Sequence, residues 1–487
     1  MQDKFSWHEN LSYTYPHWAY DVITYLIYAA FGMDGIYTTT CILSVILGIS
    51  IYFVNTKLAK NQLLSFIITI AVMYLIRGYI AARAQLVTFI LFIFTIYFIE
   101  KFLETKKKRY AIGLIIIPFL IANLHVAVFP FYFILYLPYI AEYFIAVLGD
   151  VIIYQKIKTK RIEKKIEKLS KEIGNEEKIK KLQKELKELE DKAERIKIKR
   201  SKNEMDSYKI KIEKNPNVKW LIIIMLICLF TGLLTPLGNT PYTYLIKTMQ
   251  GNTTQNINEH QPTVIANDAQ AACTVILFLA ILIFTKVKMK LRDFIMLAGL
   301  FYLMLMSRRQ ITIFTLVCSI ILNKSILDIN PYVKQNLEEV GAKINNAVGM
   351  IIIAIIMLSF SWYMAKDKVD DTYIDETAYP VQACDYIIEN IDLGKARFYN
   401  EYNYGSYMLY RGIPVFIDSR ADLYAPEFSG KKDDIFMDFI ETSNISKFYG
   451  DIFEKYDITH VITYENSKMN MIISKTQKDK YKELYKD

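Results

Sequence analysis

Long apolar segments recur along this chain of 487 residues and restrict it to a small set of folds. A helix needs roughly 20 apolar residues to cross a hydrocarbon core of about 30 Å. The candidate spans are 36–54, 63–80, 86–103, 110–122, 128–148, 218–237, 268–285, 293–307, 311–323 and 347–365. Those at 110–122 and 311–323 are short and would need flanking residues to cross. A soluble domain does not need so many apolar segments. The sequence therefore predicts a polytopic α-helical membrane protein of about ten spans, anchored among membrane lipids.

A strongly charged run separates two blocks of these segments. Residues 151–220 contain 23 Lys and Arg against 13 Asp and Glu, a net charge of +10, whereas the whole chain carries +9. Basic loops stay in the cytoplasm, so we expect the run to lie there and the spans to alternate around it. Because the excess charge is confined to this run, it gives no indication of nucleic-acid binding.

These considerations divide the chain into five parts. We expect an outer loop with an interfacial helix at 1–35, transmembrane block 1 at 36–149, a cytosolic charged hairpin at 150–217, transmembrane block 2 at 218–365 and an extracytoplasmic domain at 366–487. The protein is thus predicted to be a multi-pass protein of the cell membrane.

The charged run has the pattern of a coiled coil. Apolar residues recur at alternating spacings of three and four over 162–173 and again over 182–196, with a break at Gly174 and Asn175. Such spacings with charges between them predict two helices that pair as an antiparallel hairpin. This hairpin could be a partner-docking arm, a solvated spacer or a surface attracted to anionic lipid.

The C-terminal part differs in composition from the rest of the chain. Residues 366–487 contain 16 Lys and Arg against 23 Asp and Glu. Short β-type runs at 397–399, 415–417 and 460–463 alternate with helical patterns near 378–391, 433–443 and 447–456. This alternation predicts a small α/β domain.

The N-terminal end is polar up to residue 16 and then becomes apolar and aromatic over 17–31, a length that favours an interfacial helix. The alternation of spans places this end outside the cell. We therefore expect either that the chain inserts in this orientation unaided or that a first span precedes Met1.

Unusual polar residues gather on the predicted outer face. Arginine offers a rigid fork of donors that binds phosphate bidentately and stays charged in a low dielectric. The outer turns carry Arg77, Arg83, Arg308 and Arg309, which could surround a lipid phosphate or pyrophosphate. They could equally pair with neighbouring acids or reach headgroups. His125 and His260 lie at the same boundary and join the candidate binding residues.

If the bound phosphate carried a lipid-linked sugar, transfer of that sugar to a hydroxyl would require a general base as well. The outer carboxylates that could serve are Asp3, Asp21, Glu259 and Asp268. In the C-terminal part, Asp418, Arg420 and Asp422 follow a predicted strand, where they could bind a sugar or lock the following turn. No HxxH, HExxH or DxD spacing occurs, so the motifs do not support a divalent cation, and the cofactor stays undetermined.

Several of these motifs resemble a known group of proteins. The resemblance is carried by Asp3-Lys-Phe-Ser-Trp7, His17-Trp18, Asn123-Leu-His125, Glu259-His-Gln-Pro262, Ser307-Arg-Arg-Gln310 and Phe416-Ile-Asp418-Ser-Arg420-Ala-Asp-Leu-Tyr424. The chain resembles the GT-C glycosyltransferases, and more closely a bacterial membrane-protein family with DTFSW-like and FxDxRADLY-like motifs. The resemblance covers most of the chain except the charged hairpin.

The resemblance implies polyprenyl-phosphate sugars as donors and an acid in the first outer loop as base, for which Asp3 is the nearest match. Related chains usually carry a transmembrane helix before that acid, so we expect this sequence to begin one span late.

The leading functional hypothesis is a glycosyltransferase of the cell envelope. It would transfer a sugar from a polyprenyl-phosphate-linked donor to a surface glycan or lipid acceptor, with Asp3 and Glu259 as catalytic residues. A glycan polymerase or ligase that uses lipid pyrophosphate is the second enzymatic interpretation. A transporter would need charges inside the spans and an internal repeat, and neither is evident. A membrane scaffold that links partners through the hairpin is the remaining alternative.

Overall fold

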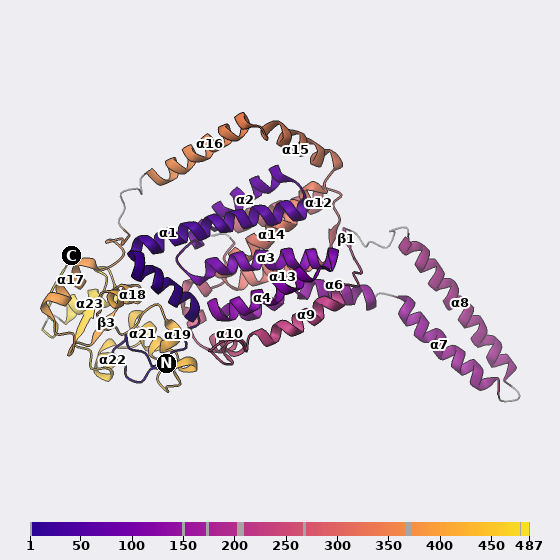
Figure 1. Cartoon of the computed structure of the whole chain (residues 1–487). Helices are drawn as coiled ribbons and strands as arrows, with labels where there is room; N and C mark the ends of the chain where they lie inside the picture. Colours follow the sequence, from indigo (N-terminus) through magenta and orange to yellow (C-terminus); the bar gives the residue numbers. More distant parts are fainter. Residues whose placement is uncertain are drawn as a thin grey trace.

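The computed structural model describes residues 2–148, 151–171, 175–201, 209–265, 269–366, 373–477 and 479–486. A helical bundle forms its centre, with a C-terminal unit at one end of the bundle and a two-helix arm at the other (Figure 1). Among the described residues, six helices are long and apolar enough to cross a membrane. These helices fit a membrane-embedded protein, as the composition predicts.

A helix occurs at each segment predicted to span. The helices of the bundle are α1 (Trp18–Ala59), α2 (Gln62–Ile76), α3 (Ala84–Thr105), α4 (Lys108–Leu124), α5 (Phe129–Ile134), α6 (Leu137–Leu148), α9 (Val218–Thr231), α12 (Ala269–Phe284), α13 (Leu291–Met306), α14 (Ile311–Leu327) and α15 (Pro331–Ile344). Helix α16 (Ala347–Ala365) follows α15 and lies apart from the bundle (Figure 1). The segment 128–148 is divided between α5 and α6. Most of these helices share one hydrophobic core, in which α14 packs against α1, α2, α3 and α13.

The predicted interfacial helix at 17–31 is joined to the first span. Both belong to α1, which is interrupted where Gly32 adopts φ +63° and ψ −154°. Glycine tolerates this positive φ because it has no Cβ, so the helix can change direction there. Helix α16, in contrast to most of the bundle helices, has no buried side chain.

The charged run forms the arm. Helices α7 (Val151–Leu169) and α8 (Glu176–Ser201) lie side by side and project from the bundle (Figure 1). Ile162 is buried in their seam, and Lys158 Nζ lies 3.1 Å from Glu185 Oε1 across it. The two helices agree with the predicted hairpin, although the break at Gly174 lies outside the described residues. Its cytosolic location stays a prediction.

The base of the arm is attached to the bundle by a group of charged residues that sequence reasoning did not single out. Strand β1 (Ile210–Lys211) pairs in parallel with β2 (Met289–Lys290), just before α13 begins. Next to this pair, Arg292 Nη1 lies 3.2 Å from Glu142 Oε2 and 3.4 Å from Glu213 Oε2. The Arg292 and Glu142 side chains are almost fully buried, at 7% and 3% exposure. Arg292 is the second residue of α13, Glu142 lies in the middle of α6, and Glu213 follows β1.

The C-terminal unit is built from short elements. They are α17 (Val381–Asn390), β3 (Phe398–Asn400), α18 (Tyr402–Tyr410), α19 (Ala421–Tyr424), α20 (Pro426–Ser429), α21 (Ile435–Ser443), α22 (Tyr449–Lys455), β4 (His460–Ile462) and α23 (Lys468–Thr476). Strands β3 and β4 are parallel, with Phe398 opposite His460. The unit has hydrophobic clusters of its own, separate from that of the bundle.

The predicted strand at 415–417 is wrong as a continuous strand. Val415 makes a single parallel bridge to Ser6, and the next backbone amide, that of Phe416, donates to the side chain of Asn400 at 2.9 Å. The Asn400 amide also donates to the Ile417 carbonyl at 2.8 Å. One buried asparagine thus takes the bonds that a neighbouring strand would have supplied.

The N-terminal segment 2–16 packs into this C-terminal unit. Leu11 and Tyr13 belong to its hydrophobic core, and the buried ring of His8 donates from Nε2 to the Phe416 carbonyl at 2.8 Å. Trp7 donates to the Phe398 carbonyl at 3.1 Å. The first and last parts of the chain therefore form one structural unit, as the position of the N-terminus in Figure 1 illustrates.

Candidate functional site

The turn that follows Ile417 carries a dense set of ionic contacts. Arg420 donates from Nε and Nη2 to the two carboxylate oxygens of Asp418, at 2.9 and 2.7 Å. Its Nη1 donates to Asp3 Oδ1 at 2.6 Å. Tyr424 also donates to Asp418 Oδ2, at 2.5 Å. The Arg420 fork is thus shared between two carboxylates, which raises its pKa despite the cost of burial.

Asp3 has little capacity left for catalysis. Its second oxygen accepts bonds from the amide and the hydroxyl of Ser6, at 2.8 and 2.7 Å, and its side chain is 0% exposed. Burial favours the neutral acid, but the bonds from Ser6 and Arg420 outweigh it and lower the pKa of Asp3. A buried carboxylate of lowered pKa whose oxygens are all engaged is a weak base. The contacts favour a role in tethering the N-terminal segment.

Close approach of two backbones fixes the position of this turn. A Cβ added to Gly405, in α18, would lie 2.1 Å from the Ile417 carbonyl oxygen and 2.8 Å from Asp418 Cα. No side chain fits there, so glycine is required for α18 to pack against the turn. The Asp418 turn is therefore placed by the N-terminal segment on one side and by α18 on another.

Asp422, four residues beyond Asp418, faces the bundle side of the unit. Its Oδ2 accepts a hydrogen bond from the hydroxyl of Tyr244, which lies on α10 (Thr240–Gln250). The Tyr244 ring packs against Phe428 with its centroid 5.1 Å away, so α10 is docked on the C-terminal unit. Burial raises the pKa of Asp422, whereas the Tyr244 bond and the charge of Arg309 oppose the rise.

Arg309 lies at the start of α14, in a short 3-10 turn (Arg308–Gln310). Arg309 is partly buried, and the charged groups that act on its guanidinium include Glu259, Arg83 and Asp422. Within the part of the chain that the structure describes, this side chain has no hydrogen-bond or ion-pair partner. It is therefore a cation that is still available to an anionic ligand.

The turn before α3 brings a second cation, Arg83, to this region, where it pairs with an acid of the loop before α12. Glu259 lies in the 3-10 turn Asn258–His260, and its Oε1 is 3.0 Å from Arg83 Nη1. Burial of Glu259 is outweighed by Arg83, which lowers the pKa of this carboxyl. The loop is held against the bundle by backbone bonds, including one from the Arg308 amide to the Gln261 carbonyl at 3.0 Å. Both side chains of the pair are about half exposed, at 60% and 49%.

Three histidines border Arg309. The rings of His17 and His125 lie 4.8 Å apart, and His125 Nδ1 is bonded to the Thr88 hydroxyl at 2.7 Å. Burial, assisted by the charge of Arg309, lowers the pKa of His17 to about 4 and also lowers those of His125 and His260. These rings are accordingly neutral near pH 7, where they can donate or accept hydrogen bonds without adding charge.

Buried polar atoms without partners occur next to this cluster. Among the described residues they include Trp18 Nε1, Arg308 Nε and Gln310 Oε1, which adjoin His17 or Arg309 in the sequence. An unsatisfied buried polar atom costs roughly 1–3 kcal/mol, so several at one place indicate a position for a bound ligand or water. We call the group Arg83, Glu259, Arg309, Asp422 and Tyr244, with the three neighbouring histidines, the junction cluster.

The structure brings together some of the residues predicted from the sequence and separates others. Arg83, His125, Glu259, His260 and Arg309 belong to the junction cluster. Asp418 and Arg420 form the adjacent turn with Asp3. Arg77 instead lies exposed over the Tyr74 ring at 3.9 Å and donates to the Tyr74 carbonyl. Asp268 lies outside the described residues.

Tyr244 is the member of the cluster that sequence reasoning missed. It lies on α10 with no recognisable motif around it, and its partner Asp422 is 178 positions away. Asp422 was predicted only as part of the turn. No group of three or more His, Cys, Asp or Glu in the described parts of the chain could hold a metal ion.

Comparisons with known proteins do not assign this chain to a family. No protein-family model matches it, and no curated protein matches it at a significant level. The functional argument therefore rests on the junction cluster itself, which combines two arginines, two carboxylates of opposite pKa shift and neutral histidines at the end of an apolar bundle.

Proposed function

We propose that this protein is a membrane glycosyltransferase that moves a sugar from a polyprenyl-phosphate-linked donor to a glycan or lipid acceptor. The observation that carries the proposal is the Arg309 guanidinium, which lacks a partner among the described residues and lies within electrostatic reach of Asp422 and Glu259. The site is at the end of helices that are apolar enough to lie in a membrane, where the phosphate of a lipid-linked donor would be located.

The cationic part of the junction cluster would bind the phosphate. Arg309 supplies a free fork of donors, and the exposed Arg83 can exchange its contact with Glu259 for one with the ligand. The neutral His17, His125 and His260 add hydrogen bonds of either polarity. As the bond between sugar and phosphate breaks, charge accumulates on the phosphate oxygens, and a fixed guanidinium stabilises that charge.

Of the three carboxylates Asp3, Glu259 and Asp422, Asp422 is the best suited to act as general base. Its pKa is raised, whereas those of Asp3 and Glu259 are lowered by their cationic partners. In the proposed step the acceptor hydroxyl gives its proton to Asp422 while its oxygen bonds to the anomeric carbon. The bond from that carbon to the phosphate oxygen breaks, and the lipid phosphate leaves with the electron pair.

Transfer of a radiolabelled hexose from a polyprenyl-phosphate carrier by the purified full chain tests the proposal. Asp422→Asn and Arg309→Gln should each lower the rate about 100-fold or more, because one removes the base and the other the phosphate ligand. Arg411→Gln is a matched control, since Arg411 pairs with Asp385 in the same unit away from the cluster. Transfer at the wild-type rate by both cluster variants would exclude the proposed site.

A glycan polymerase or ligase that uses lipid pyrophosphate would need the same cations. The free Arg309 together with Arg83 supports binding of one or two phosphates alike. The length of the product separates the two activities, because a transferase adds a single sugar per donor whereas a polymerase extends or moves a chain.

A further inference from the structure

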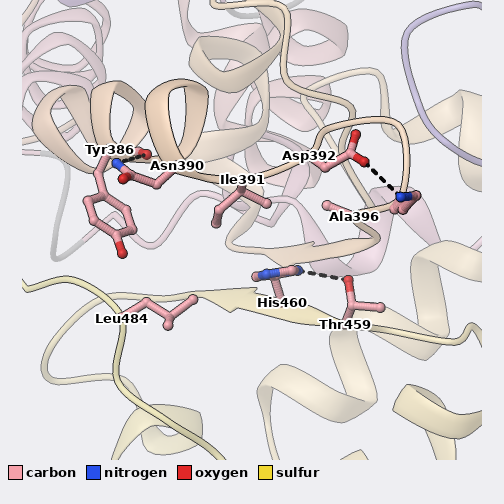
Figure 2. A pocket seen from close by; sticks show the side chains of 9 residues that line it. Tyr386, Asn390, Ile391, Asp392, Ala396, Thr459, His460 and Leu484 are labelled. Carbon is pink, nitrogen blue, oxygen red and sulfur yellow. Dashed lines mark hydrogen bonds and ion pairs between the residues drawn. The ribbon is translucent and has the colours of Figure 1, made fainter.

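A concave site lies in the C-terminal unit. Its volume is about 410 Å³, within the range of about 300–1,000 Å³ that is usual for pockets that bind small ligands. Figure 2 shows Tyr386, Asn390 and Ile391, from the end of α17 and the residue after it, on one wall. His460 and Leu484 form the facing wall.

This pocket is on the opposite face of the β3–β4 pair from the Asp418 turn. Successive residues of a strand point to opposite faces, and Phe398 packs with the cluster around α17 whereas Tyr399 packs with the cluster that includes Phe416. His460 is opposite Phe398 in the register, and their ring centroids are 5.3 Å apart. A ligand in the pocket would therefore not compete with one at the junction cluster.

The lining combines an aromatic face with neutral polar groups. The Tyr386 ring is held in place by the ring of Tyr485, which stacks at 5.1 Å with an angle of 28° between the planes. The Tyr386 hydroxyl has no hydrogen-bond partner in the described part of the chain. His460 uses Nδ1 for the Thr459 hydroxyl at 2.8 Å, which leaves Nε2 on the other side of the ring.

Charge at the pocket is balanced. Lys395 Nζ lies 3.3 Å from Asp392 Oδ2, so the cation and the acid that line the pocket pair with each other. Among the residues that line the pocket, the cation is matched by an acid, so an anionic ligand gains little net attraction here, in contrast to the junction cluster, whose Arg309 is unpaired among the described residues. A pyranose fits this lining better, because its apolar face can cover an aromatic ring while its hydroxyls bond to amide, imidazole and hydroxyl groups.

We propose that this pocket binds one sugar unit of a neutral glycan. The binding itself is independent of the function proposed above, and only its interpretation as a holding site for the acceptor chain rests on that function. A site of this kind would keep a growing or decorated glycan on the protein while its end reaches the junction cluster.

Saturation-transfer NMR on the full chain in detergent tests the binding, with neutral mono- and disaccharides of glucose, galactose and N-acetylglucosamine as probes. We expect saturable binding in the millimolar range. Tyr386→Ala and His460→Ala should weaken it about tenfold or more. Tyr386→Phe keeps the stack on Tyr485 and should weaken it less, which guards against misfolding of the alanine variant. Phe448→Ala, at an exposed aromatic of the same unit, should change nothing.

Two results would overturn the proposal. One is the absence of saturable signal from every probe with the wild-type chain. The other is binding that all pocket variants retain, which would place the sugar elsewhere. Either result would leave the transfer assay with Asp422→Asn unaffected. Conversely, pocket variants that lose binding but still transfer sugar to a free small acceptor would separate the holding site from the chemistry.

Discussion

Asp3 and Arg420 are 417 positions apart in the sequence and are joined by an ion pair of 2.6 Å. The Asp3 side chain is fully buried and that of Arg420 is 17% exposed, so water screens this pair little. The contact links the N-terminal segment to the turn that also carries Asp418 and Asp422. The junction cluster therefore depends on both ends of the chain.

Removal of Asp3 should destabilise the C-terminal unit. Asp3→Ala leaves Arg420 partly buried with one carboxylate fewer, and breaking a buried pair costs about 3–5 kcal/mol. Thermal unfolding followed by proteolytic sensitivity of the unit would measure the loss. Asp457→Ala is the control, because the Asp457 partner of Arg397 is 80% exposed and such pairs contribute about 1 kcal/mol or less. Equal stability of the two variants would contradict a tethering role.

Substitution of Gly405 should displace the Asp418 turn. Gly405→Ala would place a Cβ 2.1 Å from the Ile417 carbonyl oxygen, so the helix or the turn must shift, at a cost of about 1–3 kcal/mol. The melting temperature should fall, and transfer should fall with it. Gly299→Ala, where no atom lies within 4 Å of the new Cβ, should be tolerated or slightly stabilising. A normal melting temperature for Gly405→Ala would show that α18 does not approach the turn so closely.

The pH dependence of the transfer rate should follow the ionisation of Asp422. A general base works in its deprotonated form, so activity should rise with pH through the pKa of Asp422, which burial raises. The Tyr244 hydrogen bond lowers that pKa. Tyr244→Phe should therefore move the acidic limb of the profile to higher pH, with the plateau largely retained. A shift to lower pH, or a loss of the plateau with no shift, would contradict this assignment.

The arm should be dispensable for transfer. Replacement of 151–208 by a Gly/Ser linker keeps β1 and Glu213, which attach to β2 and Arg292 at the bundle, and removes α7 and α8. The junction cluster lies at the opposite end of the bundle, so the transfer rate should stay within about twofold of the wild-type rate, less than about 0.5 kcal/mol. A scaffold would lose its function in the same variant.

Much of this structure could be predicted from local sequence patterns, but contacts between residues far apart in the sequence could not. Helices at all ten apolar segments and the two-helix arm followed from spacing and composition, because each is decided by residues within a few turns. The prediction of a strand at 415–417 was wrong because, beyond Val415, the backbone bonds to the side chain of Asn400 and not to a neighbouring strand. Two contacts of the site, Asp422 with Tyr244 and Asp3 with Arg420, depend on the fold of the whole chain. They cannot be predicted from the local sequence pattern.

The packing of Leu11 and Tyr13 beside Phe453 has a consequence for biosynthesis. The first segment leaves the ribosome hundreds of residues before the partners that complete its hydrophobic cluster. Closing so long a loop is entropically costly and slow, so this contact belongs to the last stage of folding. The C-terminal unit can therefore assemble only after the bundle that lies between its two pieces in the sequence has been synthesised.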